Sequence, residues 1–252
     1  MNFYGFDGID IDWEFPVWSS DSKKTDRAQL GNLLEELHEA YKLSAKLVSI
    51  AVSGPPTITK VAYDVQAISA YTDMIQVMNY DFHVFNKKHN PFTGFNAPLH
   101  KMPSEFGILG QMNSEASMST WIDLGLPMNK TFFGIPMYAR GYQLATNYLH
   151  KPYSPATRAL DQYTNYPMVC PLESDKNFEK VWNSAASSPY LYGITSVWVS
   201  YENSKSVSAK VNYAKSISVA GIMTFAIGTD DVNGSCGFGE FPLLNAISSA
   251  AN

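Results

Sequence analysis

Short apolar segments alternate with amphipathic segments along most of this sequence, and that rhythm limits its fold more than any other feature. Apolar residues recur at helical spacing across 27–43, with acidic residues between them, which predicts an amphipathic helix. Apolar runs at Lys46–Val52 and Met74–Tyr80 predict buried strands, with a short helix between them at 63–70. A strand–helix–strand order of this kind predicts parallel βα units in an α/β fold.

The rhythm continues toward the C-terminus with one interruption. We expect helices near 114–124, 206–218 and 243–250, and strands at Thr131–Tyr138 and Gly221–Ile227. Residues 141–192 break the pattern, because they are rich in Tyr, Pro, Asn and Ser and are too long for an ordinary connection. We predict a small inserted subdomain there; a long ordered loop is the simpler alternative.

Composition excludes several classes of function. Of the 252 residues, 45% are hydrophobic and 16% charged, which is typical of a folded chain. The net charge of −5 and the absence of a Lys/Arg cluster argue against nucleic acid as a partner. No apolar run approaches the roughly 20 residues of a membrane span, and the five histidines show no metal-ligand spacing. We therefore expect no membrane segment, no metal and no cofactor.

Three carboxylates stand at alternate positions near the N-terminus: Asp10, Asp12 and Glu14. On a strand this spacing places them on one face, about 6.6 Å apart along the chain. Like charges this close favour retention of a proton by at least one of them, which provides an acid. A calcium loop is excluded because Phe15 and Asp21 occupy the positions that need Gly and Glu. Catalysis and the solvated face of an amphipathic strand both remain open from these residues alone.

The run Phe6–Pro16 resembles the Asp-Gly-x-Asp-x-Asp-x-Glu signature of the family 18 glycoside hydrolases, the chitinases and chitinase-like lectins. In that family the signature lies on the fourth strand of a (β/α)₈ TIM barrel. The resemblance implies an α/β fold with strands four to eight of such a barrel and a small α+β insertion after the seventh. The expected division is barrel strands four to seven in 1–140, the insertion in 141–192, and the barrel end in 193–252.

The resemblance also implies an activity, the hydrolysis of β-1,4-linked N-acetylglucosamine in chitin with retention of configuration. Glu14 would protonate the leaving oxygen, and the substrate's own acetamido oxygen would attack the anomeric carbon. Asp12 would stabilise the resulting oxazolinium ion, and Asp10 would share a proton with Asp12. Family lectins typically lack the acid at the position of Glu14.

Met78-Asn79-Tyr80-Asp81 closes a predicted strand and resembles the Met-x-Tyr-Asp motif of the sixth barrel strand. The resemblance implies that Met78 contacts the substrate and that Tyr80 and Asp81 bind its acetamido group. Taken alone, the tetrapeptide is more simply a strand end with a capping Asp.

Gly134–Gly141 resembles the seventh-strand motif Gly-x-Pro-x-Tyr-Gly-Arg, with Ala139 in place of the second glycine. Tyr138 and Arg140 would bind sugar hydroxyls, Arg140 through its fixed fork of donors. A structural salt bridge to a neighbouring carboxylate is the alternative for Arg140.

Phe225 ends the segment Gly221–Phe225, where the family usually has a tryptophan that forms the floor under the sugar. We expect a weaker sugar floor here, since phenylalanine has less area and no indole N–H; an ordinary core Phe is the alternative. The segment 198–202, followed by Ser206 and Lys210, also resembles a family motif, with Glu202 in place of Asp.

Cys170 and Cys236 on their own are compatible with one disulfide or with two buried thiols. Residues 230–237 resemble the family's closing Asp-Asp-x-x-Gly-x-Cys-Gly, whose cysteine in many members pairs with one in the insertion. The resemblance therefore implies a Cys170–Cys236 disulfide and an extracellular protein.

Nothing in the sequence resembles the first three barrel strands, and Met1 stands just before the expected fourth strand. We expect the natural protein to begin further upstream, and no signal peptide within the chain as given. Five parallel strands cannot close a barrel, so the outer two should expose backbone and apolar faces, and we expect the chain alone to be unstable or to aggregate. A glycan-binding lectin and an inactive truncated fragment are the alternatives to a chitinase.

Overall fold

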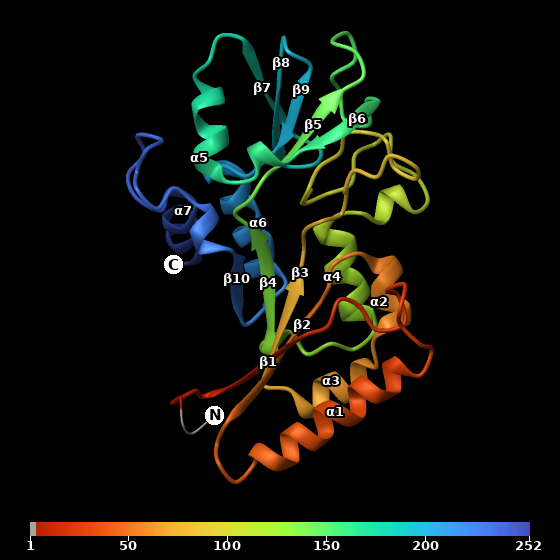
Figure 1. The fold of residues 1–252 in the computed structure, drawn as a ribbon. Helices are drawn as coiled ribbons and strands as arrows, with labels where there is room; N and C mark the ends of the chain where they lie inside the picture. Colours follow the sequence, from red (N-terminus) through yellow and green to blue (C-terminus); the bar gives the residue numbers. More distant parts are fainter. Residues whose placement is uncertain (1–3) are drawn as a thin grey trace.

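The computed structural model describes residues 4–252, whose strands form one parallel and one antiparallel sheet (Figure 1). The parallel sheet has the order β1-β2-β3-β4-β10 and follows the order of the chain. Its strands are β1 Gly8–Asp12, β2 Leu47–Ser53, β3 Met74–Met78, β4 Thr131–Pro136 and β10 Gly221–Phe225. Because the strands are parallel, all five C-terminal ends lie at the same end of the sheet.

The three central strands are largely apolar because most of their side chains are buried. In β2 every residue from Val48 to Ser53 is buried, and Val77 and Ile135 in the next strands have no exposed surface. Near-continuous burial of this kind is typical of parallel strands covered by helices. Gly54 follows β2 where a side-chain Cβ would stand 2.2 Å from the Met78 carbonyl oxygen, so only glycine allows the two strand ends to approach.

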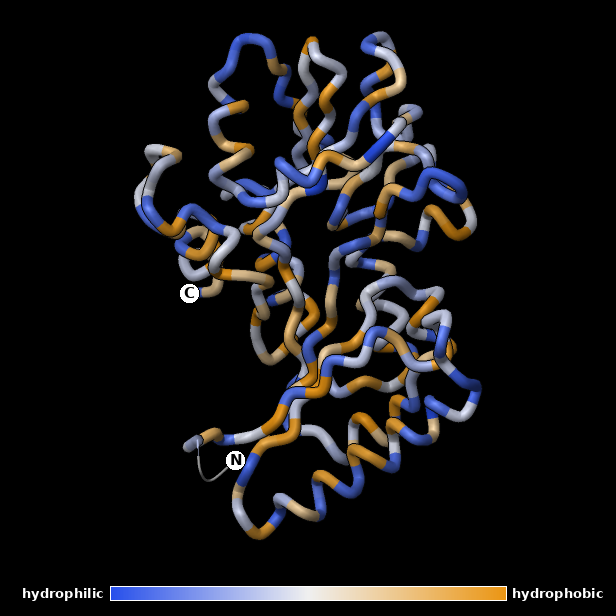
Figure 2. Tube along the Cα trace, viewed as in Figure 1, coloured by the Kyte–Doolittle hydropathy of each residue, from blue (hydrophilic) through white to orange (hydrophobic). Residues whose placement is uncertain are grey.

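Helices connect the parallel strands and cover the sheet. α1 shows alternating hydrophilic and hydrophobic residues along its length (Figure 2), and Leu30 and Leu34 form its buried stripe. Asn113 and Asn203 cap α4 and α6 by accepting hydrogen bonds from backbone N–H groups of the first turn. The helices are α1 Asp26–Tyr41, α2 Pro56–Ala62, α3 Val65–Tyr71, α4 Ser114–Asp123, α6 Ser204–Ser216 and α7 Pro242–Ala251.

The second sheet forms a separate layer beyond the C-terminal end of β4, at the top of Figure 1. Its order is β6-β5-β9-β8-β7, all antiparallel, with α5 Tyr166–Val169 between β6 and β7. Tyr142 and Trp198 pack in its core. The sheet runs from residue 140 to residue 200 and is longer than the expected 141–192. Its strands are β5 Arg140–Leu144, β6 Ala156–Leu160, β7 Phe178–Asn183, β8 Ser188–Gly193 and β9 Val197–Ser200.

Each strand and helix predicted outside 141–192 is present, with ends that differ from the prediction by a few residues. Helix α2 was not predicted. In the part of the sheet that the structure describes, β1 and β10 are the two edges, as expected. Whether these edges destabilise the chain stays a prediction.

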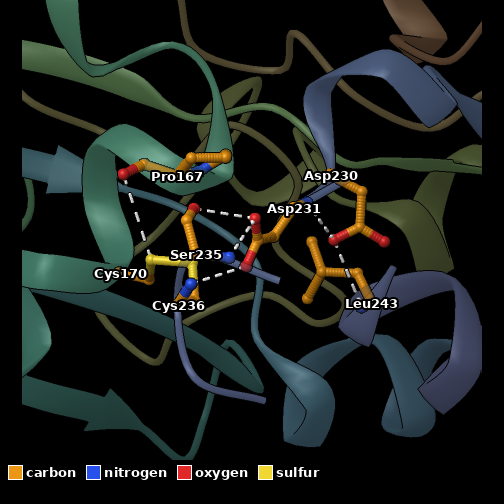
Figure 3. The surroundings of a disulfide bond; sticks show 7 residues. All are labelled: Pro167, Cys170, Asp230, Asp231, Ser235, Cys236 and Leu243. Atoms are coloured by element: carbon orange, nitrogen blue, oxygen red, sulfur yellow. Dashed lines mark hydrogen bonds between the residues drawn. A yellow bond between two sulfur atoms is a disulfide. The ribbon is translucent and has the colours of Figure 1, made fainter. Parts of the chain in front are cut away.

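The Cys170–Cys236 disulfide is confirmed, with the two Cα atoms 5.7 Å apart (Figure 3). It joins the segment between β6 and β7 to the loop before α7. Asp231 organises that loop by accepting hydrogen bonds from the Ser235 N–H and Oγ and the Cys236 N–H. Asp230 accepts from the Leu243 N–H at the start of α7. The disulfide therefore ties the second sheet's segment to the last helix of the parallel layer.

Candidate active site

The three predicted carboxylates lie on one face of β1 and just beyond its end. Asp10, Asp12 and Glu14 are exposed, whereas Ile11 and Trp13 between them are partly buried and pack against the main core. The alternation follows from the two-residue period of a strand, with one face toward the helices and the other toward solvent. The predicted placement of all three carboxylates on one face is confirmed.

The carboxylates open into a cleft of about 270 Å³ at the C-terminal ends of the parallel strands. Ligand sites of α/β sheets and barrels typically lie at this end. The cleft brings together residues from all five strands or the segments that follow them. They are Asp10, Asp12, Glu14, Ala51, Gln76, Met78, Tyr80, Asp81, Tyr138, Met223, Thr224 and Phe225.

Asp10 lies deepest along the strand and is held by neighbours from β2 and β3. Its Oδ1 accepts a hydrogen bond from Ser49 Oγ at 2.5 Å, and Ser49 is its register partner on β2. In the amide orientation that satisfies its surroundings, Gln76 also donates to this oxygen, at 3.1 Å. Partial burial and the neighbouring charge of Asp10 raise the pKa of Asp12.

Glu14 stands where the carboxylates meet the residues that follow β3. Partial burial, the charge of Asp12 and the charge of Asp81 together raise its pKa above that of an ordinary glutamate. A carboxyl group whose pKa is raised in a cleft keeps its proton to higher pH and can donate it to a substrate. The electrostatics of the cleft therefore suit Glu14 to the role of an acid.

Asp81 is the centre of a second group of polar side chains. Its Oδ1 accepts hydrogen bonds from the Tyr138 hydroxyl at 2.6 Å and from Arg140 Nε and Nη2 at 2.8 and 2.5 Å. Arg140 thus forms the salt bridge considered as its alternative, and it lies beside the cleft rather than in its lining. The pair fixes the direction of the Asp81 carboxylate next to Tyr138.

Three aromatic rings form one wall of the cleft. Tyr80 stacks on Phe225 with ring centroids 6.0 Å apart, and Tyr138 meets both rings edge to face. Phe225 is 55% exposed, so its ring is available to a ligand and is not a core residue. Burial and nearby carboxylates raise the pKa of the Tyr80 hydroxyl, which therefore stays protonated as a hydrogen-bond donor.

The described part of the chain offers no group of three or more His, Cys, Asp and Glu side chains arranged to hold a metal ion. Across residues 4–252, no helix combines the length and the apolar character needed to cross a membrane.

Sequence reasoning missed several residues of the site. Ser49 and Gln76 could have been recognised from the sequence, because each is a polar residue inside a largely apolar strand. Asn96 could not. Its amide oxygen accepts hydrogen bonds from the Asp81 N–H and from Arg140 Nε, and it lies in a long loop far from both in sequence.

Comparison with known proteins is consistent with this geometry. The model of the family described as glycosyl hydrolases family 18 matches residues 1–230. Chitotriosidase-1 of Mus musculus is 30% identical to this chain over 98% of it, and the match covers 55% of the mouse protein. The chain spans about half the length of the curated relatives it matches.

Solved structures of similar sequence have the same fold. The group IV chitinase of Ostrinia furnacalis in complex with allosamidin aligns with a TM-score of 0.91 at 34% identity, over 98% of this chain and 68% of that one. Human YKL-39, described as a pseudo-chitinase with retained chitooligosaccharide binding properties, aligns with a TM-score of 0.88 at 26% identity, over 99% of this chain and 70% of its own.

Proposed function

The chain belongs to the glycosyl hydrolases family 18, and on that premise we propose that it hydrolyses β-1,4-linked N-acetylglucosamine polymers, the class of chitin. One observation carries the proposal. Asp10, Asp12 and Glu14 face a cleft whose other walls are a polar group around Asp81 and an exposed aromatic ring, Phe225. Carboxylates supply the chemistry of glycoside cleavage, and aromatic rings bind the faces of sugars.

In the proposed first step Glu14 transfers its proton to the glycosidic oxygen as the bond from that oxygen to the anomeric carbon breaks. The raised pKa of Glu14 supports this role, since the acid must still hold its proton when substrate arrives. Glu14 then acts as the base that takes a proton from the water that completes the reaction.

The nucleophile in the proposed mechanism is the acetamido oxygen of the substrate, which bonds to the anomeric carbon and gives an oxazolinium ion. Asp12 stabilises the positive charge of that ion, and Asp10 biases the protonation of Asp12. Tyr80 and Asp81 bind the acetamido group and hold it in line. Two displacements at one carbon return the original configuration, so the reaction retains the anomer.

We further propose that Met78, Tyr138, Arg140 and Phe225 contribute to sugar binding. The Tyr138 hydroxyl and the Arg140 guanidinium both bind Asp81, so they would act on the sugar together with it. Phe225 provides a smaller floor than tryptophan would. The allosamidin complex of the Ostrinia furnacalis chitinase supports a carbohydrate ligand for this fold.

We propose that the parallel sheet is the part of a (β/α)₈ barrel that holds strands four to eight, with the second sheet inserted after the seventh. The parallel order β1-β2-β3-β4-β10 and the similarity to the chitinase fold support this assignment. The disulfide supports an extracellular location, because such bonds persist in oxidising compartments.

A glycan-binding protein without turnover is the second candidate, and the similarity to YKL-39 favours it. Phe225 does not distinguish the two candidates, since a smaller sugar floor is compatible with weak binding as well as with catalysis. Glu14 separates the two, because a protein that only binds sugar has no need of an acid whose pKa is raised.

The test uses three tetrasaccharides of the same linkage: the N-acetylglucosamine tetramer, its fully deacetylated form, and the glucose tetramer. We expect the folded fraction of the 252-residue chain to cleave only the first, because only that substrate carries the attacking acetamido oxygen. Proton NMR of the first turnovers should show the β-anomer. Cleavage of the deacetylated tetramer, or an α-anomer as first product, would overturn the mechanism; binding of the first tetramer without cleavage would identify the lectin.

A further inference from the structure

Asn96 lies directly behind the Asp81–Arg140 pair, in the segment between β3 and α4. The residue is 2% exposed. Its Oδ1 accepts a hydrogen bond from the backbone N–H of Asp81 at 3.0 Å and another from Arg140 Nε at 3.3 Å. A single amide oxygen therefore holds both the backbone of the carboxylate residue and the guanidinium that binds its side chain.

The position of Asn96 is itself fixed by its backbone. Its N–H donates to Ser200 Oγ at 2.9 Å, and its carbonyl oxygen accepts from the Phe82 N–H at 3.0 Å. Ser200 is the register partner of Arg140 across β9 and β5 of the second sheet. Asn96, Ser200 and Arg140 thus form a closed arrangement that links the second sheet to the cleft.

Asp81 has an uncommon backbone conformation. Its φ is 57°, in the left-handed region that residues with a side chain seldom adopt. This conformation turns the Asp81 carboxylate toward Tyr138 and Arg140 immediately after the strand ends. The hydrogen bond from the Asp81 N–H to Asn96 is the contact that holds this peptide from outside the strand.

We propose that Asn96 is a positioning residue for the reaction: its amide oxygen holds Arg140 against Asp81 and so sets the position and the direction of the carboxylate that faces Glu14. This inference rests on the proposed function of the cleft. Asn96 contacts no reacting atom; it acts through Asp81 and Arg140. Its acceptor oxygen carries the role, since the oxygen makes both contacts.

Several charged groups surround Glu14. Asp10 and Asp12 line the same cleft from β1, and Asp81 lines it from the segment after β3. Arg140, after β4, acts through its salt bridge to Asp81. The phenols of Tyr63, Tyr80 and Tyr138 stay protonated because burial raises the pKa of each. Burial and the charge of Asp12 raise the pKa of Glu14 most, and the charge of Asp81 raises it further. A change in how Arg140 pairs with Asp81 therefore changes the pH at which Glu14 loses its proton.

Two substitutions separate positioning from simple stability. Asn96→Ala removes the acceptor and should lower kcat/KM on the N-acetylglucosamine tetramer about tenfold or more, as expected for the loss of a hydrogen bond to a charged group. Asn96→Asp keeps an acceptor of the same shape but adds a negative charge that competes for Arg140. We expect it to retain more activity than the alanine variant and to move the alkaline limb of kcat/KM to higher pH.

Asn113 provides the matched control. It is equally buried, and its side chain bonds only to the Ala116 N–H and the Gly110 carbonyl among the described contacts, at the cap of α4. Asn113→Ala and Asn113→Asp should leave kcat/KM and its pH profile unchanged below the unfolding temperature. Equal losses in the two alanine variants, or no pH shift in Asn96→Asp, would overturn the proposal.

A second readout does not depend on turnover. The chain has three arginines, so side-chain Nε–H signals in nitrogen-15 NMR are few, and Arg140→Lys identifies the one from Arg140. We expect this signal to keep its position in Asn113→Ala, and in Asn96→Ala to shift and to exchange faster with solvent, because Arg140 Nε then keeps its bond to Asp81 but loses the one to Asn96. If wild type cleaves nothing, the proposed function fails while this signal still decides the role of Asn96. An Arg140 signal unchanged in Asn96→Ala would refute that role.

Discussion

Lys210→Met should destabilise the fold strongly, because it leaves a buried carboxylate without its counter-charge. Lys210 Nζ lies 2.6 and 2.7 Å from the two oxygens of Glu202, and the two side chains are 0% and 3% exposed. Among the described contacts, the Glu202 side chain then keeps only its hydrogen bond from Ser206 Oγ. Removing one partner of a buried pair costs about 3–5 kcal/mol of unfolding free energy.

The measurement is urea unfolding followed by tryptophan fluorescence and by far-ultraviolet circular dichroism. Every sample contains the same concentration of trimethylamine N-oxide, which stabilises the folded state. This keeps the unfolding free energy measurable for a chain whose parallel sheet has two open edges. With a slope of about 3 kcal/mol per molar urea, the midpoint should fall by about 1–2 M. The midpoint shift can be converted into a change in unfolding free energy only if both probes report the same transition.

The control variants define what is being measured. Lys215 lies on the same helix as Lys210, but it is exposed and donates to backbone carbonyls at the end of α7. Lys215→Met should therefore cost less than about 1 kcal/mol of unfolding free energy. Glu202→Met combined with Lys210→Met removes both charges and should recover most of the loss. Burial raises the pKa of Glu202, and loss of Lys210 raises it further, so the deficit of the single variant should narrow as the pH falls and Glu202 takes up a proton.

The single substitution would refute this reasoning if it cost less than about 1 kcal/mol, or if the double variant were as unstable as the single one. The first result would show that water or other polar groups compensate Glu202 once Lys210 is gone, and the second that the loss comes from packing and not from the unpaired charge of Glu202.

Three further predictions concern the cleft and the disulfide. Phe225→Trp should tighten binding of the N-acetylglucosamine tetramer about fivefold, since about 40 Å² of added ring contact contributes about 1 kcal/mol; titration calorimetry checks this, and unchanged affinity would remove Phe225 from the binding surface. Cys170→Ser combined with Cys236→Ser opens a loop closed across 66 residues and should cost about 4 kcal/mol of unfolding free energy, whereas a loss below about 1 kcal/mol would mean that the loop is held without the bond. Burial and the charge of Asp12 raise the pKa of Glu14, so Asp12→Asn should move the alkaline limb of residual kcat/KM to lower pH; a limb that stays in place or rises would contradict the coupling.

The parallel layer could be predicted because its signals are local. The strands are short apolar runs, and α1 has a clear helical period with Leu30 and Leu34 on its buried side. Helix α2 escaped prediction because a pair of prolines usually marks a loop. Here Pro56 occupies the first turn of the helix, where its missing N–H costs nothing.

The second sheet and the supports of the site could not be predicted in the same way. β5 starts only a few residues after β4 ends, and its partner β9 lies more than 50 residues further along the chain. The contact between Asn96 and Ser200 joins residues 104 positions apart. Local periodicity carries no information on such pairs. The pairing of Cys170 with Cys236 likewise came from family resemblance and not from spacing.

The three carboxylates of the cleft could be identified as a group from their two-residue spacing, but the separate roles proposed for them depend on their neighbours. Asp10 is distinguished by Ser49, and Glu14 by its position between Asp12 and Asp81. The sequence of β1 alone does not show that Ser49 and Asp81 lie beside these carboxylates.

The most direct test of the account is turnover and binding by Glu14→Gln. We expect kcat on the N-acetylglucosamine tetramer to fall by about 10³-fold, within the range that general acids contribute. The dissociation constant of the tetramer should stay within about threefold, because glutamine keeps the shape of the cleft. Glu36→Gln, an exposed change on α1, should behave as wild type. Turnover by Glu14→Gln close to that of wild type would contradict the assignment of Glu14 as the acid.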